Sequence, residues 1–353
     1  MLDITRRRAR GGVFVIAGVF GAFALGLLAG ATVSQAAEHT KYPLTLRNCG
    51  VSVTFDKAPQ RAVAIGQNST EILLSLGLAD KIAGTAVWVG PVLKPFESEN
   101  ARIKRLADNS PSFESVVGQE PDLVAAQFEW DVGPQGAVGT RRQFGDLGIP
   151  TYISPADCVA KDNSGGGDGV RKEPFTMDLV YQEIRELAEI FDVQERGEKL
   201  VAELKKREAD AIASVAGEKG TGLPVVFWFS SKDVKGDAFV AGRNGAPAYM
   251  LRVLGADNII DTNEEWPLVS WETIAAKNPA VIVIGEMTRR RYAADDPAVK
   301  VNFLETDPVV SQLDVVKQKH FVMMDAQAMN PTIRTIDGIE ALAAGIKTFG
   351  LAK

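Results

Sequence analysis

Residues 61–78, RAVAIGQNSTEILLSLGL, contain the pattern that decides the fold. Residues 61–65 are a short apolar run of the kind that forms a buried strand, and polar residues follow it at once. The apolar positions that come next recur with helical spacing, Asn68 or Ser69 is a suitable N-cap, and Gly77 is a suitable C-terminal end. A strand that leads directly into a helix predicts one unit of an α/β fold.

Strand and helix patterns of the same kind recur along the chain. Short apolar strands are predicted at residues 82–87, 122–126, 150–153, 224–229, 281–284 and 321–324, and helices at 113–118, 141–147, 246–254 and 337–349. The longest helical stretch covers residues 177–216, with a second helix starting near residue 194, and alternating residues at 42–55 predict a hairpin. Short apolar strands that alternate with helices are typical of parallel sheets covered on both faces.

The order of these elements predicts two lobes in an α/β fold. A chain of 353 residues is long enough for two domains, and the α/β pattern restarts after the long helical stretch. We therefore expect two three-layer α/β lobes with parallel sheets joined by a single long α-helix. The predicted boundaries are residues 1–37 for a signal peptide, 38–174 for the N-terminal lobe, 175–193 for the inter-lobe helix and 194–353 for the C-terminal lobe.

The first residues have the composition of a secretory signal peptide. Four arginines within residues 6–10 form a basic region, residues 13–31 are apolar, and small residues follow at 33–37. This pattern predicts export to the periplasm through a cleaved signal. A signal that is kept as a membrane anchor is the alternative.

The composition excludes several classes of protein. The chain is 46% hydrophobic and 24% charged, which fits a folded globular protein, and only the N-terminal apolar run is long enough to consider as a membrane span. The formal net charge of −6 argues against a nucleic-acid binder, which needs a basic surface. Two cysteines exclude a cysteine-rich zinc site, and two histidines are too few for a multi-histidine metal site.

Cys49 and Cys158 are the two cysteines of the chain. In the oxidising compartment that export implies, a lone pair of cysteines is expected to form a disulfide. The pair lacks the Cys-x-x-Cys spacing of redox-active sites, so we expect a structural bridge between the start of the exported chain and the end of lobe one. Two buried free thiols are the alternative.

The sequence contains none of the common catalytic or nucleotide-binding motifs. It has no nucleophile elbow, no P-loop and no His-Glu-x-x-His zinc motif. The glycine-rich residues 161–174 lack the spacing of a phosphate loop, and we interpret His39 and His320 as a terminal and a surface residue. We therefore expect a protein that is not an enzyme and has no cofactor of its own.

Three segments carry a resemblance to a known family. They are residues 58–78 (APQRAVAIGQNSTEILLSLGL), 113–124 (FESVVGQEPDLV) and 271–284 (WETIAAKNPAVIVI). With the signal peptide and the helix between two lobes, they resemble the iron-siderophore and cobalamin class of periplasmic substrate-binding proteins of ABC importers. The resemblance covers residues 42–350 and implies a small closure of the lobes on a ligand and an inner-membrane ABC permease as a partner. We expect a monomer.

The resemblance also implies how the protein docks. In the family, an acidic residue at the apex of each lobe binds arginines of the permease; matched by motif, these residues are Glu71 in TEIL and Glu272 in WETI. Two like charges on separate lobes fix the orientation of a partner. Without the resemblance, each would be interpreted as a solvated carboxylate on a helix.

Unusual side chains lie at the predicted carboxyl ends of the strands and in the loops beyond, where α/β sheets bind ligands. The candidate ligand-binding residues are Asn68, Trp88, Phe128 and Trp130 from lobe one and Trp228, Ser230, Arg243, Trp266, Arg289, Arg290 and Tyr292 from lobe two. Aromatic faces suit a bulky, partly apolar chelate, and arginines suit an anionic one. Core packing of the rings and solvation of the arginine run are the alternatives.

These inferences predict a periplasmic binding protein that captures a metal chelate, first of all a ferric siderophore, and delivers it to the permease. Iron is expected only as part of the ligand, because two histidines are too few for the bare-ion sites of related receptors. Cobalamin, haem or another cofactor-like ligand is the alternative within the class. A secreted α/β enzyme that uses the same cleft and a sensor without a permease are the alternatives outside it.

Overall fold

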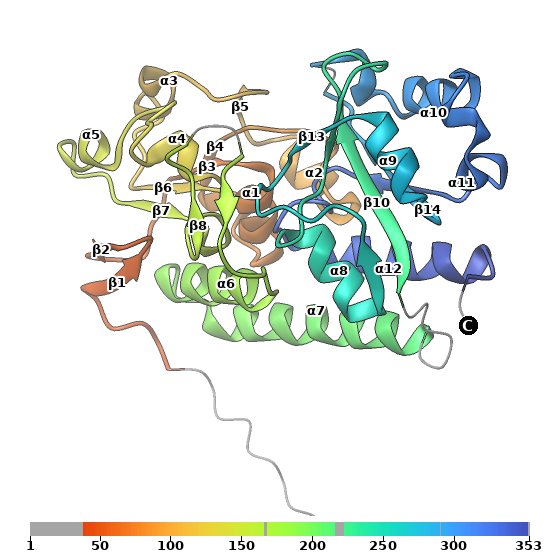
Figure 1. The fold of residues 1–353 in the computed structure, drawn as a ribbon. Coiled ribbons are helices and arrows are strands. Elements are labelled where there is room, and N and C mark those ends of the chain that lie inside the picture. The colour runs from red at the N-terminus through yellow and green to blue at the C-terminus, as the bar shows by residue number, and fades with distance from the viewer. Residues whose placement is uncertain (1–37, 166–167, 216–221, 290, 352–353) are drawn as a thin grey trace, which may run out of the picture. The chain divides into compact units, whose positions relative to one another are not determined.

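The computed structural model describes residues 38–165, 168–215, 222–289 and 291–351. The predicted signal peptide, residues 1–37, lies outside these ranges. Within them, no helix combines the length and the apolar character needed to cross a membrane. The described chain forms two α/β lobes, each built on a sheet with parallel strands at its centre (Figure 1). The predicted α/β class is confirmed.

The described chain starts with the predicted hairpin. β1 (Leu44–Asn48) pairs antiparallel with β2 (Val51–Phe55). The turn residues Cys49 and Gly50 both have positive φ, 50° and 81°, as the favoured two-residue hairpin turn requires. Glycine adopts this conformation without a steric cost, which explains its place in the turn.

Five of the described strands of lobe one form a parallel sheet in the order β5-β4-β3-β6-β7. They are β3 (Ala62–Ile65), β4 (Ile82–Ala86), β5 (Arg105–Ala107), β6 (Leu123–Ala126) and β7 (Thr151–Ile153). The helices are α1 (Gln67–Ser75), α2 (Glu97–Asn100), α3 (Phe113–Val117), α4 (Glu129–Val132) and α5 (Arg141–Gly145). Every residue of the central strands β3 and β6 is buried, as expected of strands covered on both faces.

Helix α1 begins earlier than predicted. Gly66 is its N-cap residue, and both predicted caps, Asn68 and Ser69, lie inside the helix. The φ of Gly66 is 134°, and a Cβ at this position would lie 2.3 Å from Cβ of Gln127. The turn between β3 and α1 therefore requires glycine, and the side chain of Asn68 is free of the capping role predicted for it.

The helical stretch after lobe one contains two helices, as predicted, and the first of them covers the residues expected for the inter-lobe helix. The predicted helical stretch is divided into α6 (Asp178–Ile190) and α7 (Gln194–Ser214) near Asp192, whose φ is 57°. α7 packs against α6 and against α12 (Thr335–Thr348) of lobe two, and Figure 1 shows it running beneath both. The long hydrophobic pattern thus marks a corner between two helices.

The sheet of lobe two is mixed. Its described strands are β10 (Leu223–Ser230), β11 (Ala238–Val240), β12 (Ala256–Asn258), β13 (Leu268–Val269), β14 (Val281–Glu286) and β15 (Phe321–Asp325). The predicted strands β10, β14 and β15 run parallel, and β12, which was not predicted, is parallel to β10, whereas β11 and β13 are antiparallel to their neighbours. β11, β12 and β13 have two or three residues each, which is too few to show a period, and the sequence did not indicate them.

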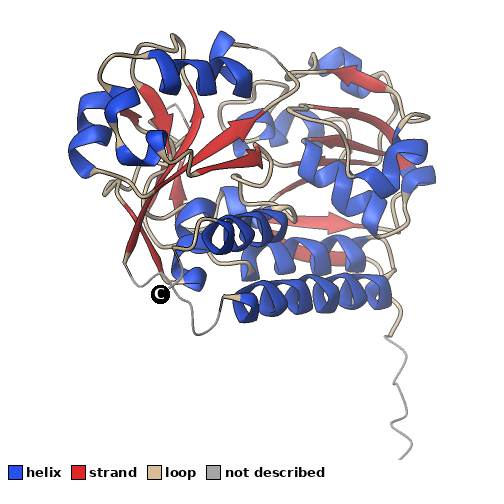
Figure 2. Cartoon of the chain, turned by 90° about the vertical axis from the view of Figure 1, so that its right-hand side faces the viewer, coloured by secondary structure: helices blue, strands red, loops and turns tan. Residues whose placement is uncertain are grey.

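Helices cover both sides of the sheets (Figure 2). Those of lobe two, besides α12, are α8 (Ala246–Leu254), α9 (Trp271–Lys277), α10 (Pro297–Thr306) and α11 (Asp314–Lys317). α8 ends at Gly255, whose left-handed conformation stops the helix. The three-layer arrangement leaves the carboxyl ends of the parallel strands as the place where the two lobes meet.

Candidate ligand-binding site

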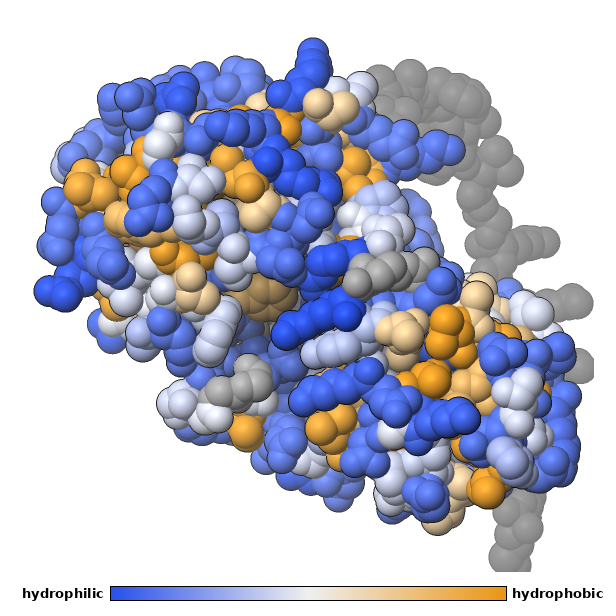
Figure 3. Space-filling model, turned by 90° about the horizontal axis from the view of Figure 1, so that it is seen from above, coloured by the Kyte–Doolittle hydropathy of each residue, from blue (hydrophilic) through white to orange (hydrophobic). Residues whose placement is uncertain are grey.

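The strand ends of the two lobes come together at a pair of glutamines. Gln127 follows β6, Gln327 follows β15, and Nε2 of Gln127 donates a hydrogen bond to Oε1 of Gln327 at 3.2 Å. Both side chains are buried, so they belong to the floor on which the lobes meet. Seen from above, the surface is hollowed near the middle, with strongly hydrophilic side chains beside the hollow (Figure 3).

The loops that follow β4 and β14 also touch. The backbone oxygen of Val89 accepts hydrogen bonds from the backbone N–H of Thr288 at 3.0 Å and of Arg289 at 3.2 Å. Nη1 of Arg289 donates to Oδ1 of Asn109 at 3.0 Å. Arg289, a predicted ligand contact from lobe two, therefore reaches across to lobe one.

A further contact between the lobes involves the predicted glycine-rich loop. Within it, β8 (Lys161–Asp162) and β9 (Val170–Arg171) form a short hairpin. Nε of Arg171 donates to Oε2 of Glu265 at 2.9 Å, and Nη2 donates to the backbone oxygen of Ala156 at 2.9 Å. Because Ala156 belongs to lobe one and Glu265 to lobe two, this buried guanidinium links them.

Aromatic side chains are open to solvent at the strand ends of both lobes. Trp130, on α4 directly after β6, is 51% exposed. Phe229 is the next-to-last residue of β10. Its ring forms a tilted pair with that of Trp266, with the ring centroids 4.7 Å apart, and both side chains are partly exposed. Phe128 and Tyr292 are partly exposed as well. These rings are the part of the aromatic set that a ligand can reach.

Two predicted tryptophans lie in the interior instead. Trp88 is 2% exposed, carries the guanidinium of Arg105 4.5 Å from its ring centroid, and donates from Nε1 to Thr85. Trp228 is fully buried and packs edge-on against Trp271. The prediction that these rings wall the cleft does not fit their burial. Successive side chains of a strand point to opposite faces, so the ring that opens at the end of β10 is that of the next residue.

The predicted residue Ser230 is buried and has a structural partner. Its hydroxyl donates to Oδ1 of Asp295, which is buried as well. Oδ2 of Asp295 accepts from the backbone N–H of Arg291 at 2.6 Å and of Tyr292 at 2.8 Å. This carboxylate therefore fixes the loop that carries Tyr292 against the end of β10.

Asn68, the remaining polar candidate of lobe one, is buried and hydrogen-bonds to lobe two and to helix α6. Its Oδ1 accepts from the backbone N–H of Ile333 at 3.0 Å, and its Nδ2 donates to Oε2 of Glu183 on α6 at 3.2 Å. Ser154 donates to the same carboxyl oxygen. Burial raises the pKa of Glu183 to about 8, so this carboxyl group is mostly protonated at neutral pH.

The predicted arginines are engaged by the protein itself. Nη1 of Arg243 pairs with Asp261 at 2.7 Å, and Nε donates to Oδ1 of Asn263 at 2.7 Å. Arg289 is held by lobe one, as described above, and burial lowers the pKa of its guanidinium. Arg290 lies outside the described residues. The described contacts thus do not support a basic surface prepared for an anion.

Carboxylates lie at the same strand ends. Glu286 and Asp325 are register partners at the last positions of β14 and β15. Burial raises the pKa of Glu286, and the charge of Asp325 raises it further. Asp325 in turn pairs with Nη1 of Arg334 at 3.2 Å. The site therefore presents both signs of charge beside its aromatic rings.

Glu71 is not presented on the surface. It is 1% exposed, and its carboxylate receives both Nε and Nη2 of Arg334, with Nε 2.8 Å from Oε2. Burial raises the pKa of Glu71, and the neighbouring guanidinium opposes this shift. The prediction that this residue docks to a permease does not fit its burial. Glu272, by contrast, is exposed on α9.

A different residue of lobe one matches the setting of Glu272. Helices α3 and α9 each begin after a serine, Ser112 and Ser270, whose hydroxyl caps the backbone N–H three residues on. Glu114 and Glu272 each occupy the second helical position and are exposed. The sequences SFES and SWET carry this signal, which the motif match to Glu71 missed.

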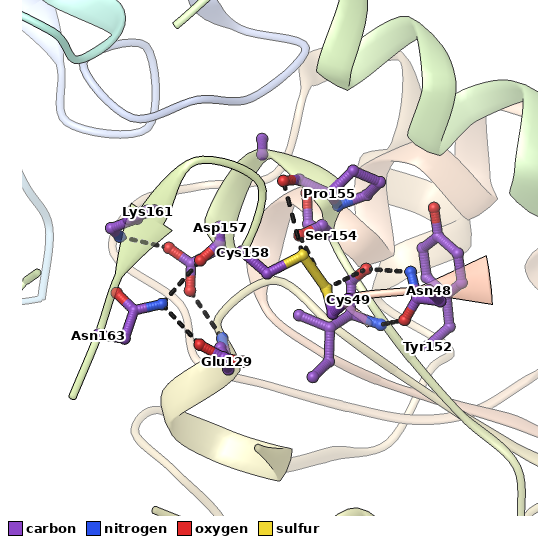
Figure 4. The surroundings of a disulfide bond; sticks show 12 residues. Asn48, Cys49, Glu129, Tyr152, Ser154, Pro155, Asp157, Cys158, Lys161 and Asn163 are labelled. Carbon is purple, nitrogen blue, oxygen red and sulfur yellow. Dashed lines mark hydrogen bonds and ion pairs between the residues drawn. A yellow bond between two sulfur atoms is a disulfide. The ribbon is translucent and has the colours of Figure 1, made fainter. Parts of the chain in front are cut away.

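The predicted disulfide is present. Cys49 and Cys158 are bonded with their Cα atoms 5.6 Å apart (Figure 4). The bond connects the hairpin turn to the end of η3 (Pro155–Asp157), a short helix that follows β7.

Among the described residues, no group of three or more His, Cys, Asp and Glu side chains is placed to hold a metal ion.

The chain is similar in sequence to known binding proteins. The profile of a family described as "Periplasmic binding protein" matches residues 63–328. The chain is 24% identical over 316 residues to the uncharacterized ABC transporter substrate-binding lipoprotein YvrC of Bacillus subtilis, covering 89% of this chain and 88% of that protein. It is 21% identical over 229 residues to the vitamin B12-binding protein of Pectobacterium carotovorum, covering 64% and 71%.

A solved structure with a related fold is that of the ABC-type Fe3+-hydroxamate transport system from Saccharomonospora viridis. Its TM-score is 0.68 at 25% identity, and the alignment covers 87% of this chain and 99% of that one. The similarity therefore extends over both lobes and the helices that join them.

Proposed function

Since the chain belongs to the periplasmic binding protein family, whose members bind transport substrates and are not enzymes, we propose that it captures a bulky metal chelate for an ABC importer. The open aromatic rings carry this proposal: Trp130 comes from lobe one and the Phe229–Trp266 pair from lobe two. Large flat rings at strand ends suit a ligand with an extensive apolar surface.

The ligand that best fits the charges carries little net charge. Arg243 and Arg289 are bound to acceptors of the protein, and Glu286 adds an acidic group at the same strand ends. A strongly anionic chelate would have to displace these partners and meet a carboxylate. A ferric tris-hydroxamate is close to neutral, because three hydroxamate anions balance Fe3+. We therefore favour a ferric hydroxamate siderophore, which also agrees with the named relative from Saccharomonospora viridis.

Cobalamin is the second candidate. Several similar proteins are named as vitamin B12-binding or cobalamin-binding proteins, at 21–23% identity. A corrin ring would also bury a large surface against aromatic side chains. Haem is a third candidate: His320 lies at the amino end of β14, at the opposite end of that strand from Glu286, so the partly exposed Tyr292 would be the iron ligand that this chain offers at the site.

The first experiment is a tryptophan-fluorescence titration of the protein purified after export. Ferric desferrioxamine B, ferric enterobactin, ferric citrate, haem and cyanocobalamin are added in turn, each beside its metal-free form where one exists. We expect saturable binding of the ferric hydroxamate and weak binding of the anionic chelates. Binding of cobalamin alone would replace the iron assignment, and absence of binding across the panel would contradict the proposal.

Substitution of the open rings tests the site itself. Trp130→Ala and Trp266→Ala are each expected to weaken binding by about 1–3 kcal/mol, since each removes one aromatic contact surface. Leu147→Ala, which truncates another exposed apolar side chain in lobe one, is the matched control and should leave the dissociation constant unchanged. Unchanged affinity in both tryptophan variants would place the ligand elsewhere.

We also propose that Glu114 and Glu272 dock to the permease. They are exposed, lie in matching first turns of α3 and α9, and provide one carboxylate on each lobe. The double variant Glu114→Arg/Glu272→Arg is expected to abolish uptake and to keep ligand affinity. The control is Glu97→Arg/Glu195→Arg, which reverses exposed first-turn carboxylates of α2 and α7. Normal uptake by the first variant would refute the docking role.

A further inference from the structure

The disulfide is attached to a helix, η3, that contacts both sides of the proposed site. Cys158 directly follows η3, and its partner Cys49 forms the turn of the first hairpin (Figure 4). Beside it, Asn48 is buried and holds the end of β7: Nδ2 donates to the backbone oxygen of Ile153 and Oδ1 accepts from its N–H, each at 2.8 Å. The hairpin turn is thus joined to the chain on both sides of η3, by hydrogen bonds before it and by a covalent bond after it.

On the side of lobe one, η3 holds helix α4. Oδ2 of Asp157 accepts from the backbone N–H of Glu129, the first residue of α4, at 2.7 Å, and Oδ1 pairs with Nζ of Lys161 (Figure 4). Nδ2 of Asn163 donates to Oε2 of Glu129 at 2.8 Å. These contacts satisfy a backbone donor at the start of a helix of one turn, which has few bonds of its own. The next residue of α4 is Trp130.

On the side of lobe two, η3 is connected through Arg171 to the loop that carries Trp266. The backbone oxygen of Ala156 accepts from Arg171, and Arg171 pairs with Glu265, the residue before Trp266. The N–H of Glu265 donates to the backbone oxygen of Gly169 at 3.0 Å. Arg171 and Glu265 are both buried, so their ion pair is only weakly screened by salt.

We propose that η3 and its disulfide act as a positioning element that sets Trp130 and Trp266 in place on opposite sides of the ligand. The inference rests on the proposed function, because it takes both rings as ligand contacts. The covalent bond holds η3, Asp157 of η3 holds α4, and Arg171 connects η3 to the loop of lobe two. Walls that are fixed before binding lose less conformational entropy when the ligand enters.

Amide hydrogen exchange of the exported protein without ligand tests this arrangement. Three variants are compared with the wild type: Cys49→Ser/Cys158→Ser, Asp157→Ala and Arg171→Met. We expect faster exchange at residues 128–132 in the Asp157 variant, at residues 264–266 in the Arg171 variant, and at both segments in the disulfide variant. The backbone N–H groups of Glu129 and Glu265 are the sensitive reporters, since both have acceptors in this network.

General destabilisation is separated from positioning by a matched control. Ile339→Ala removes a fully buried side chain of α12 and is expected to lower global stability without selective change in those two segments. If the disulfide variant shows the same uniform pattern as Ile339→Ala, the disulfide is a stabiliser only and the inference is wrong.

Ligand binding provides the second arm. With ferric desferrioxamine B or cyanocobalamin, whichever binds the wild type, the disulfide variant is expected to bind about tenfold more weakly, while Ile339→Ala binds normally. Equal affinity of the disulfide variant and the wild type would overturn the inference. If neither probe binds the wild type, the ligand assignment fails, and the exchange result alone decides whether η3 positions the two rings.

Discussion

In both lobes the same local structure precedes a central strand, but different contacts hold the strand ends in place. In each, a serine-capped helix, α3 or α9, is followed by a residue with positive φ, Glu120 at 50° or Asn278 at 45°, and then by a proline. Beyond the strands the likeness ends. Lobe one has a disulfide, whereas lobe two has the buried Lys300, whose ammonium donates to the backbone oxygens of Gly285, at 2.7 Å, and Phe229.

This difference separates local from long-range causes. The helix, turn and strand entry repeats because neighbouring residues make it, through a cap, a left-handed residue and a proline. The contacts at the strand ends, the disulfide in lobe one and Lys300 in lobe two, join residues far apart in the chain, so they differ between the lobes. The ion pair between Glu71 and Arg334, which lie 263 residues apart, then joins the two lobes.

The largest effect is expected where lobe one depends on lobe two. Arg334→Met leaves the buried carboxylate of Glu71 without its guanidinium, and we expect the free energy of unfolding to fall by about 3–5 kcal/mol. Urea denaturation followed by circular dichroism measures this loss. The double variant Glu71→Gln/Arg334→Met should recover part of it, since Glu71, the more buried of the two carboxylates that pair with Arg334, is then replaced by a neutral amide and only Asp325 loses its partner. A loss under about 1 kcal/mol in the single variant would mean that the pair does not couple the lobes.

The support within lobe two comes next. Lys300→Met keeps most of the side-chain volume but removes the donor to the oxygens of Phe229 and Gly285, and we expect a loss of about 2–3 kcal/mol. Thermal unfolding monitored by tryptophan fluorescence reports it through the neighbouring Trp228. Lys319→Met, an exposed lysine in the same lobe, is the control. Equal stability of the two variants would show that the strand ends do not need the ammonium.

Glu183, on the helix that follows lobe one, makes the link between the lobes dependent on pH. Its pKa is raised from the usual 4.5 to about 8 in the folded protein, so the folded state binds this proton more tightly than the unfolded chain. The stability that it contributes is complete below about pH 4.5 and is lost as the pH rises through about 8, with a slope of at most about 1.4 kcal/mol per pH unit.

The measurement is the difference in unfolding free energy between the wild type and Glu183→Gln from pH 5 to 8. The amide imitates the protonated carboxyl group, so the variant should gain stability relative to the wild type as the pH rises. The neighbouring carboxyl groups of Glu186 and Asp157 are present in both proteins, so their contributions cancel in the difference. A constant difference would contradict a raised pKa.

The smallest effects test the part that the lobes share. Ser112→Ala and Ser270→Ala each remove the hydroxyl that caps α3 or α9, and each should cost about 1 kcal/mol. Replacement by aspartate or asparagine should restore most of the loss. If urea denaturation shows unequal losses of unfolding free energy, the two caps contribute differently to stability despite the same local pattern.

Much of the fold follows from local patterns in the chain. The α/β class, most buried strands and the first hairpin could be predicted, because alternation and helical spacing act between near neighbours. The disulfide could be predicted as well, because the chain has a single pair of cysteines. The antiparallel edge of lobe two could not, since β11 and β13 are too short to have a period.

The candidate site shows the opposite balance. Local sequence places aromatic and charged residues at strand ends, but it does not say whether a side chain turns outward, as Trp130 does, or inward, as Trp228 does. Likewise, the local sequence suggests an exposed helix carboxylate at both Glu71 and Glu114, but Glu71 is buried, where it accepts from Arg334 of the other lobe and from the backbone N–H of Leu93. Burial and ion pairing depend on contacts between distant parts of the chain, and those exist only once both lobes have folded and met.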